Sequence, residues 1–156
     1  MTRFRRTLAL TAATSLLAPA VALAVSGPRK GHRYTGRTSQ HRKVTARVTS
    51  DGKTLQLRFD QVFTCSNGHQ KVSNAKFVRQ APRIRPDGTF DYHKTYDDEP
   101  GVPGFDEVRS EVQGVTGRFD ASGTRVTGTV TGDVTGQESG LHCTSKVTFT
   151  ARLRKA

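Results

Sequence analysis

Tryptophan is absent from this chain, methionine occurs once, and hydrophobic residues fill only 33% of its 156 positions. A chain with so few large apolar side chains buries a modest core and gains from an additional stabiliser. Beyond residue 24, apolar residues never recur at helical spacing between caps. The same part of the chain has no apolar run long enough to cross a bilayer. These absences argue against a helical bundle and against a helical membrane protein with several spans.

The first 24 residues lack acidic side chains and have the three parts of a secretory leader. Three arginines lie within the first six positions, residues 7–24 are uncharged, and the segment closes on the small residues of Ala22-Leu23-Ala24. We expect cleavage after Ala24 by a Sec-type signal peptidase, giving a secreted, extracellular protein with no transmembrane anchor. The alternative is an uncleaved leader that serves as an anchor, which the threonines and Pro19 of the segment disfavour.

Acidic residues are scarce, with 13 against 25 lysines and arginines and a net charge of +12. Removal of the leader leaves 22 basic and 13 acidic residues, or +9 on 132 residues. A cationic exported protein attracts polyanions, such as phosphate-bearing wall polymers, anionic lipid headgroups or extracellular nucleic acid. Export excludes intracellular nucleic acid as a partner.

Residues 61–86 contain no acidic side chain at all. We predict that this stretch contributes a basic binding surface. Its cations are Lys71, Lys76, Arg79, Arg83 and Arg85. The alternative is that outward strand positions only need to be polar and are filled with arginine and lysine for that reason.

Strict alternation of apolar and polar residues dominates the rest of the chain. Val44–Val48 and Leu55–Phe59 alternate on either side of Asp51-Gly52, which is the pattern of a β-hairpin with a tight turn. Further strands are predicted at 75–79, 89–93, 108–119, 124–135 and 143–153. The sequence therefore predicts an all-β fold of about eight strands, either an antiparallel β-sandwich or a small closed barrel. The last strand is expected to pair near the first hairpin and close the sheet.

The predicted organisation has three parts. Residues 1–24 are the signal peptide, residues 25–33 are a basic arm too poor in apolar side chains to fold, and residues 34–156 are a single all-β domain. We expect the mature protein to be a monomer without a cofactor or a bound metal.

Two cysteines, Cys65 and Cys143, are the only ones in the chain. Stepping by two along the predicted strands places both on the apolar faces, where an internal crosslink between an early and a late strand belongs. In an exported protein such a pair predicts a disulfide. The alternative, a reactive or metal-binding thiol pair, needs a nearby base or further ligands that the sequence does not show.

An acidic segment, residues 91–107, holds six of the 13 acidic residues beside several aromatic side chains. Its Pro and Gly residues predict a long loop, and loops of this kind often bind ligands. The candidate loop residues are Tyr96, Asp97, Asp98 and Glu99. They could hold calcium or act as catalytic carboxylates together with His93, but the spacing of an EF-hand is absent and paired carboxylates need to face each other. A solvated or internally ion-paired loop is the alternative, and no catalytic or metal-binding residue is assigned.

Threonines alternate with valines and glycines along residues 126–135 and form a regular row of hydroxyls. Such a row can order water only if neighbouring strands repeat it. Because threonine also favours strands for conformational reasons, we interpret the series as structural.

In its succession of turns, strand cores and cysteines, the chain resembles an uncharacterised family of small secreted β-rich proteins from high-GC Gram-positive bacteria of the actinobacterial type. The motifs are Tyr34-Thr35-Gly36, Asp51-Gly52, Cys65, Asp87-Gly88-Thr89-Phe90, Gly117-Arg118-Phe119, Gly123-Thr124, Cys143 and Val147-Thr148-Phe149-Thr150-Ala151. The resemblance implies a fold and no catalytic or binding residue.

The function expected from the sequence is a binding or interaction module at the cell envelope, with the basic surface in contact with an anionic polymer. Two other classes stay open. One is a secreted hydrolase that uses the acidic segment 91–107, and the other is an inhibitor-like module that presents this segment to an extracellular protein.

Overall fold

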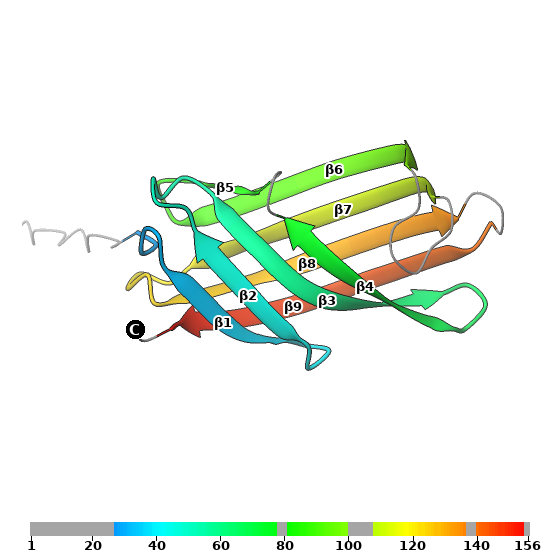
Figure 1. Cartoon of the computed structure of the whole chain (residues 1–156), viewed down its shortest axis with the longest axis horizontal. Coiled ribbons are helices and arrows are strands. Elements are labelled where there is room, and N and C mark those ends of the chain that lie inside the picture. The colour runs from blue at the N-terminus through cyan, green and yellow to red at the C-terminus, as the bar shows by residue number, and fades with distance from the viewer. Residues whose placement is uncertain (1–26, 78–80, 100–107, 137–139, 155–156) are drawn as a thin grey trace, which may run out of the picture.

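The computed structural model describes residues 27–77, 81–99, 108–136 and 140–154. These residues form nine antiparallel strands and no helix, which confirms the all-β prediction (Figure 1). The strands are β1 (Arg33–Thr38), β2 (Lys43–Val48), β3 (Leu55–Cys65), β4 (Gln70–Phe77), β5 (Arg83–Ile84), β6 (Thr89–Glu99), β7 (Val108–Phe119), β8 (Arg125–Gly136) and β9 (His142–Leu153).

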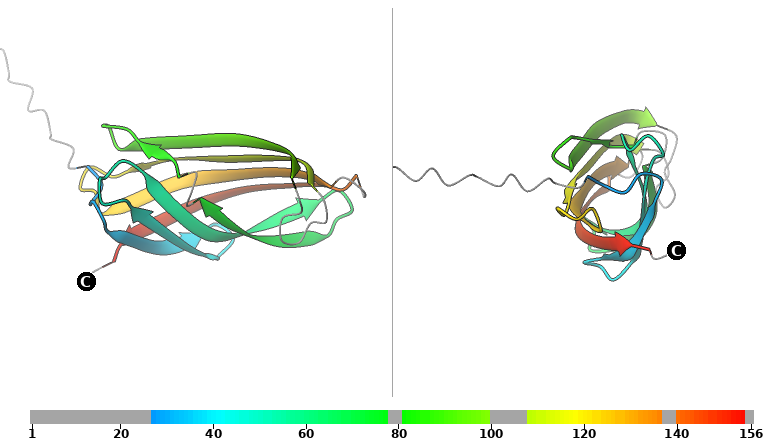
Figure 2. Two further views of the ribbon diagram at one scale, coloured as in Figure 1. Left: turned by 45° about the horizontal axis from the view of Figure 1, so that its top comes forward. Right: turned by 90° about the vertical axis from the view of Figure 1, so that its left-hand side faces the viewer.

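The strands follow the order β4-β3-β2-β1-β9-β8-β7-β6-β5 in one strongly curved sheet. An additional pairing of β3 with β9 closes β1, β2, β3 and β9 into a four-stranded barrel. The curvature brings β1 to β4 across the layer formed by β6 to β9, as the views in Figures 1 and 2 show. The last strand thus pairs beside the first hairpin and closes the sheet, as predicted.

Alternation along the strands sorts the side chains into an inner and an outer face. β3 and β9 alternate between buried and more exposed positions over almost their whole lengths. The main apolar cluster lies between the layers and includes Tyr34, Leu57, Phe90, Val130 and Phe149. A smaller cluster lies at the far end of β3 and contains Phe63, Cys65, Val134 and Cys143.

The disulfide prediction is confirmed, because Cys65 and Cys143 are bonded and stand directly opposite each other on β3 and β9. Both cysteines are buried, with 5% and 0% of their surfaces exposed. The crosslink therefore lies inside the smaller apolar cluster, at the point where the four-stranded barrel closes.

Three elements differ from the expectations drawn from the sequence. β1 was not predicted as a strand, because its inner positions are Tyr34, Gly36 and Thr38 and no apolar alternation is visible. β5 was not predicted either. It has only two residues, and these are extended because they pair with β6. β4 begins at Gln70, five residues before the predicted start, because its first half places polar side chains on the inner face.

The segment before β1 is described from Gly27 onward. The Gly31 N–H donates to the Thr49 carbonyl (3.1 Å), and the Arg29 N–H donates to the Tyr34 hydroxyl (3.0 Å). That hydroxyl donates in turn to the Gly123 carbonyl (2.7 Å). These bonds attach the described end of the basic arm to β2 and to the turn between β7 and β8.

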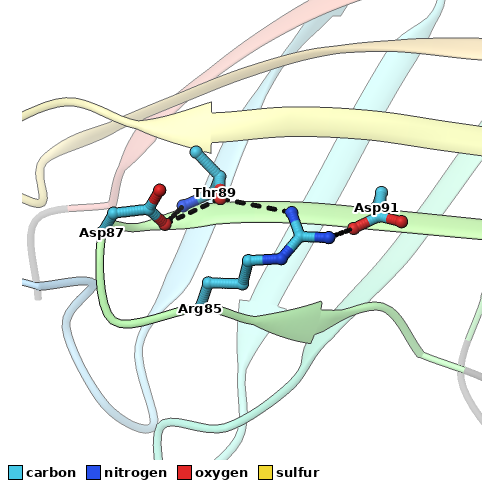
Figure 3. Close-up of polar contacts among 4 residues, drawn as sticks. All are labelled: Arg85, Asp87, Thr89 and Asp91. Carbon is cyan, nitrogen blue, oxygen red and sulfur yellow. Dashed lines mark hydrogen bonds and ion pairs between the residues drawn. The ribbon is translucent and has the colours of Figure 1, made fainter.

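Three hairpin turns are each held by an aspartate carboxylate. In every case the carboxylate accepts hydrogen bonds from backbone N–H groups and from nearby hydroxyls, which is the typical role of aspartate in a turn. The contacts are Asp51 with Lys53 N and Thr49 Oγ1, Asp87 with Thr89 N and Oγ1, and Asp120 with Thr124 N, Arg125 N and Ser122 Oγ. Figure 3 shows the second of these turns.

These bonds lower the pKa of all three carboxyl groups. For Asp51 and Asp87 the hydroxyl of Thr49 or Thr89 is the largest cause, followed by a backbone N–H. For Asp120 the largest single influence is desolvation, which raises the pKa, but the combined hydrogen bonds outweigh it and the net shift is downward. The folded state therefore holds these groups ionised at a lower pH than the unfolded chain does.

Acid is expected to destabilise the protein through these turns. Below pH about 4 the unfolded chain binds more protons than the folded one, so stability is lost as the pH falls through the lowered folded-state pKa values. Denaturant unfolding at a series of pH values between 2 and 6 measures the loss. The Asp51→Asn, Asp87→Asn and Asp120→Asn triple variant should show a shallower decline, and a decline as steep as that of the wild type would contradict the assignment.

Candidate functional site

The outer face of the curved sheet carries a concentration of cations. Exposed arginines and lysines point outward from β1, β2 and β3 and continue onto β4, β8 and β9. We call this set the cationic face. Its members are Arg33, Arg37, Lys43, Arg47, Arg58, Lys76, Arg125 and Arg152.

The strand register places these cations opposite one another rather than opposite acids. Four cross-strand pairs join like charges, and like charges in directly opposed positions destabilise a sheet. The pairs are Arg33 with Arg47, Arg37 with Lys43, Arg58 with Lys76, and Arg125 with Arg152. A surface filled with cations merely to be polar would not require this repeated opposition.

Carboxylates do not neutralise the cationic face in the part of the chain that the structure describes. The two ion pairs among the described residues are Arg85 with Asp91 and His142 with Asp133 (2.8 Å), and both lie outside the face. The acidic residue on the outward side of β3, Asp60, instead accepts a hydrogen bond from Asn74 (2.6 Å).

Two shallow depressions lie in the cationic face. One, of about 230 Å³, is lined by Arg33, Thr45, Arg47, Gln56 and Arg58. The other, of about 330 Å³, is lined by Thr35, Gly36, Arg37 and Lys43. Both linings combine cationic groups with hydroxyl groups, and the first adds an amide. Such a set of donors suits the oxygens of phosphate or carboxylate groups.

The cations predicted from residues 61–86 do not form one surface. Lys76 belongs to the cationic face, opposite Arg58. Lys71 stands opposite Phe63 and therefore shares the inner face of the sheet. Arg83 and Arg85 lie on or beside β5, at the other end of the strand order. Arg79 lies outside the described residues.

Arg85 already has partners of its own. It is ion-paired with Asp91, and its Nη1 donates to the Thr89 hydroxyl (3.3 Å) (Figure 3). The acid-free stretch 61–86 did not indicate this ion pair, because Asp91 lies five residues beyond it. The β5–β6 turn brings Asp91 beside Arg85.

The two arginines of the first hairpin were not predicted as binding residues, although they occupy its outward positions. Arg47 and Arg58 alternate with its buried residues, so parity alone placed them on the solvent side. The register that sets Arg33 beside Arg47 was not readable, because β1 has no apolar alternation of its own.

The acidic segment is strand as far as Glu99, and not a loop from residue 91 onward. Tyr96 pairs with Glu111, Asp97 with Ser110 and Glu99 with Val108 in the β6–β7 ladder. Asp98 lies in the same strand, and residues 100–107 are outside the description. The hydrolase and partner-binding roles of this segment stay predictions. Among the described residues, no group of three or more His, Cys, Asp or Glu side chains could hold a metal ion.

The threonine row of β8 is repeated on its neighbours. Thr116, Thr129 and Thr148 stand in one line across β7, β8 and β9. Thr127 stands opposite Thr150, and Arg37 of the cationic face stands opposite Thr150 on the other side. The hydroxyls therefore adjoin the cationic face and add neutral donors along its border.

No helix in the described ranges is long and apolar enough to cross a membrane. A comparison with known proteins found no matching family model, no matching curated protein and no matching solved structure. By its fold the chain is an all-β protein with one buried disulfide.

Proposed function

We propose that the protein is a secreted binding module of the cell envelope and that its cationic face holds an anionic polymer. The observation that carries the proposal is the set of four like-charge pairs without carboxylate partners. Such an arrangement costs stability in the free protein, and a bound polyanion would offset that cost.

A polymer fits this surface better than a single small anion. Adjacent strands are about 4.8 Å apart, and cations of β1, β2 and β3 lie together around the two depressions. These neighbouring cations can each meet a different charged group of one chain. Every contact releases counterions and adds to the affinity. The predicted export favours a phosphate-bearing wall polymer, and the resemblance to small secreted proteins agrees with that location.

Nucleic acid is a weaker candidate for the same surface. Proteins that hold single strands usually stack bases on exposed aromatic side chains. In the described ranges the one large hydrophobic side chain that is exposed is Val72, and the ring-bearing residues of β1 and β3, Tyr34, Phe59 and Phe63, are buried. The cationic face therefore offers charge and hydroxyls but no stacking platform.

Replacing Arg47 and Arg58 with glutamine is expected to weaken binding of the mature protein to a phosphodiester wall polymer at least about tenfold at low salt. The slope of log K against log salt should fall by about two, one unit for each lost contact. Fluorescence anisotropy with a labelled polymer between about 0.05 and 0.5 M salt measures both quantities.

The matched control is Lys53→Gln with Arg83→Gln. It removes the same charge from exposed positions outside the cationic face. This variant should keep the wild-type slope of log K against log salt, apart from a small decrease caused by its lower net charge. Equal losses in the two variants would show that only overall charge matters, and salt-independent retention of the polymer would refute electrostatic binding altogether.

A further inference from the structure

The two depressions of the cationic face meet at one cross-strand pair of threonines. Thr45 lines the depression of about 230 Å³, and Thr35, which stands directly opposite it, lines the depression of about 330 Å³. Both threonines occupy outward positions and are half-buried. The two depressions are therefore neighbours on the β1–β2 ladder, and the Thr35–Thr45 pair is the boundary between them.

Cationic pairs flank the threonine pair on both sides. Arg33 stands opposite Arg47 two residues before Thr35 on β1, and Arg37 stands opposite Lys43 two residues after it. Outward positions recur about every 7 Å along a strand, so the two cationic pairs are about 14 Å apart along the ladder. The hydroxyls lie midway, and the outer surface of the ladder alternates cation, hydroxyl and cation.

β3 makes the first depression the more cationic of the two. Gln56 stands opposite Arg47, Arg58 stands opposite Thr45, and both line this depression together with Arg33. Three guanidinium groups and one amide therefore surround it, while the second depression has one guanidinium and one ammonium group. Guanidinium and ammonium groups are the usual partners of phosphate oxygens. Each depression is thus suited to one phosphate group.

The positions of the acidic residues limit this path to two depressions. In the part of the chain that the structure describes, neither lining contains an acid. Asp60 of β3 accepts a hydrogen bond from Asn74 of β4, on the side of β3 that faces away from β2. A third depression, of about 250 Å³, is lined in part by Arg47 and Thr49, but the Thr49 hydroxyl donates to the Asp51 carboxylate. That carboxylate disfavours an anion at the third depression.

Arg37 is positioned at the second depression by a single backbone contact. Its Nη1 donates to the His41 carbonyl in the turn between β1 and β2 (3.0 Å). A guanidinium group has five N–H donors, so one bond to a carbonyl leaves most of them for a ligand. Arg37 therefore combines a defined position with the capacity to bind a phosphate.

We propose that the two depressions hold two successive phosphates of a polyol phosphate polymer, with the hydroxylated polyol of the repeat over the Thr35–Thr45 pair. The inference rests on the proposed function and names the unit of the polymer that the cationic face recognises. Threonine hydroxyls both donate and accept hydrogen bonds, as polyol hydroxyls do. Inorganic polyphosphate lacks this unit, because its neighbouring phosphates share one oxygen and have no polyol between them.

A short ligand that reaches both depressions should bind more tightly than one that reaches a single depression. Once one phosphate is bound, the other is held near its own depression at a high effective concentration. Ribitol 1,5-bisphosphate is the probe, because a five-carbon polyol separates its phosphates. The flexible stems of the arginines and of Lys43 can lean toward the threonine pair to meet a unit shorter than the distance between the cationic pairs.

The first experiment titrates isotope-labelled mature protein with ribitol 1,5-bisphosphate, ribitol 5-phosphate and pyrophosphate. NMR follows the side-chain amide of Gln56 in the first depression and the backbone amide of Gly36 in the second. The bisphosphate should shift both resonances with one dissociation constant, at least about tenfold lower than those of the other two ligands. Equal affinities for the bisphosphate and pyrophosphate would overturn the inference, as would the absence of saturable shifts.

The second experiment removes the cations of one depression at a time. Arg47→Gln with Arg58→Gln changes the first depression, and Arg37→Gln with Lys43→Gln changes the second. Either double variant should bind the bisphosphate only about as tightly as ribitol 5-phosphate, a loss of at least about tenfold. A double variant that keeps the wild-type preference would show that the two depressions do not act together, and the inference would fail.

The matched control is again Lys53→Gln with Arg83→Gln, which lowers the charge by the same amount outside both depressions. This control should keep the preference for the bisphosphate over the monophosphate. Ribitol 5-phosphate should still shift Gly36 when the first depression is changed, and Gln56 when the second is changed. Loss of both responses in one variant would indicate a general effect of charge and would contradict two separate phosphate positions.

Thr45→Val tests the hydroxyls between the depressions. It should weaken binding of the bisphosphate several-fold and leave pyrophosphate binding unchanged, since only the bisphosphate places a polyol at the threonine pair. Thr129→Val, on β8 and outside both linings, is the control and should change neither. Equal affinities of the Thr45→Val variant and the wild type for the bisphosphate would remove the polyol from the inference.

The polymer titration described above separates this inference from the proposed function. Polymer binding that depends on Arg47 and Arg58, without a preference for the bisphosphate over pyrophosphate, would keep the proposed function and refute the polyol phosphate unit. A preference for the bisphosphate without polymer binding would do the reverse.

Discussion

Replacement of Cys65 and Cys143 with alanine is expected to lower the free energy of unfolding by about 4 kcal/mol. The disulfide joins positions 78 residues apart, and without it the unfolded chain recovers the entropy of a long open loop. A loss of this size is a large part of the stability of a small domain. Urea unfolding of the mature protein and of the double variant, followed by circular dichroism, measures the difference.

The structure adds a local reason for a large effect. β3 and β9 share two residue pairs, Thr64 with Thr144 and Cys65 with Cys143, so the crosslink supports a short ladder at the closure of the four-stranded barrel. Reduction of the wild type should reproduce the loss, while reductant should leave the alanine variant unchanged. A difference below about 1 kcal/mol would mean that the ladder closes as well without the bond.

Gly36→Val is expected to cost about 3 kcal/mol or more. Gly36 lies on β1 opposite Ala151, and a Cβ at this position would collide with the Thr150 carbonyl oxygen and lie 2.7 Å from the Ala151 Cα. Backbone atoms cannot move aside as a flexible side chain can, so β1 and β9 would have to separate. Thermal and urea unfolding of the variant measure the cost.

Thr35→Val is the matched control for that substitution. It introduces the same valine into the same strand one residue earlier, where the side chain points to the outer face and is half-buried. Its effect should stay within about 0.5 kcal/mol. Equal destabilisation by the two variants would indicate that β1 tolerates no valine, rather than that Gly36 permits a close approach of the strands.

Local alternation was enough to predict the strands that carry the core. The hairpin around Asp51-Gly52 and the inward parity of Cys65 and Cys143 required only the period of two, and the structure confirms both. β1 was missed because a glycine and a threonine hold inner positions of that strand. Its strand conformation comes from the neighbours on both sides, β2 and β9.

The candidate sites depended on information that the sequence does not display. The cationic face arises when β1, β2, β3 and β9 curve together, and pairing of Arg33 with Arg47 is a matter of register between strands. Counting charges along the sequence therefore grouped Lys71 with Arg85. The fold places Lys71 on the inner face of β4 and Arg85 beside β5, at the other end of the strand order.

The pairing of β1 with β9 determines where the described chain enters and leaves the domain. The Arg154 N–H donates to the Arg33 carbonyl (2.9 Å), so the entry to the first strand and the exit from the last one are adjacent. A tether added at either end would therefore leave from the same corner of the domain. The disulfide lies near the opposite end of β9, so a tether at that corner leaves the disulfide end of the domain clear.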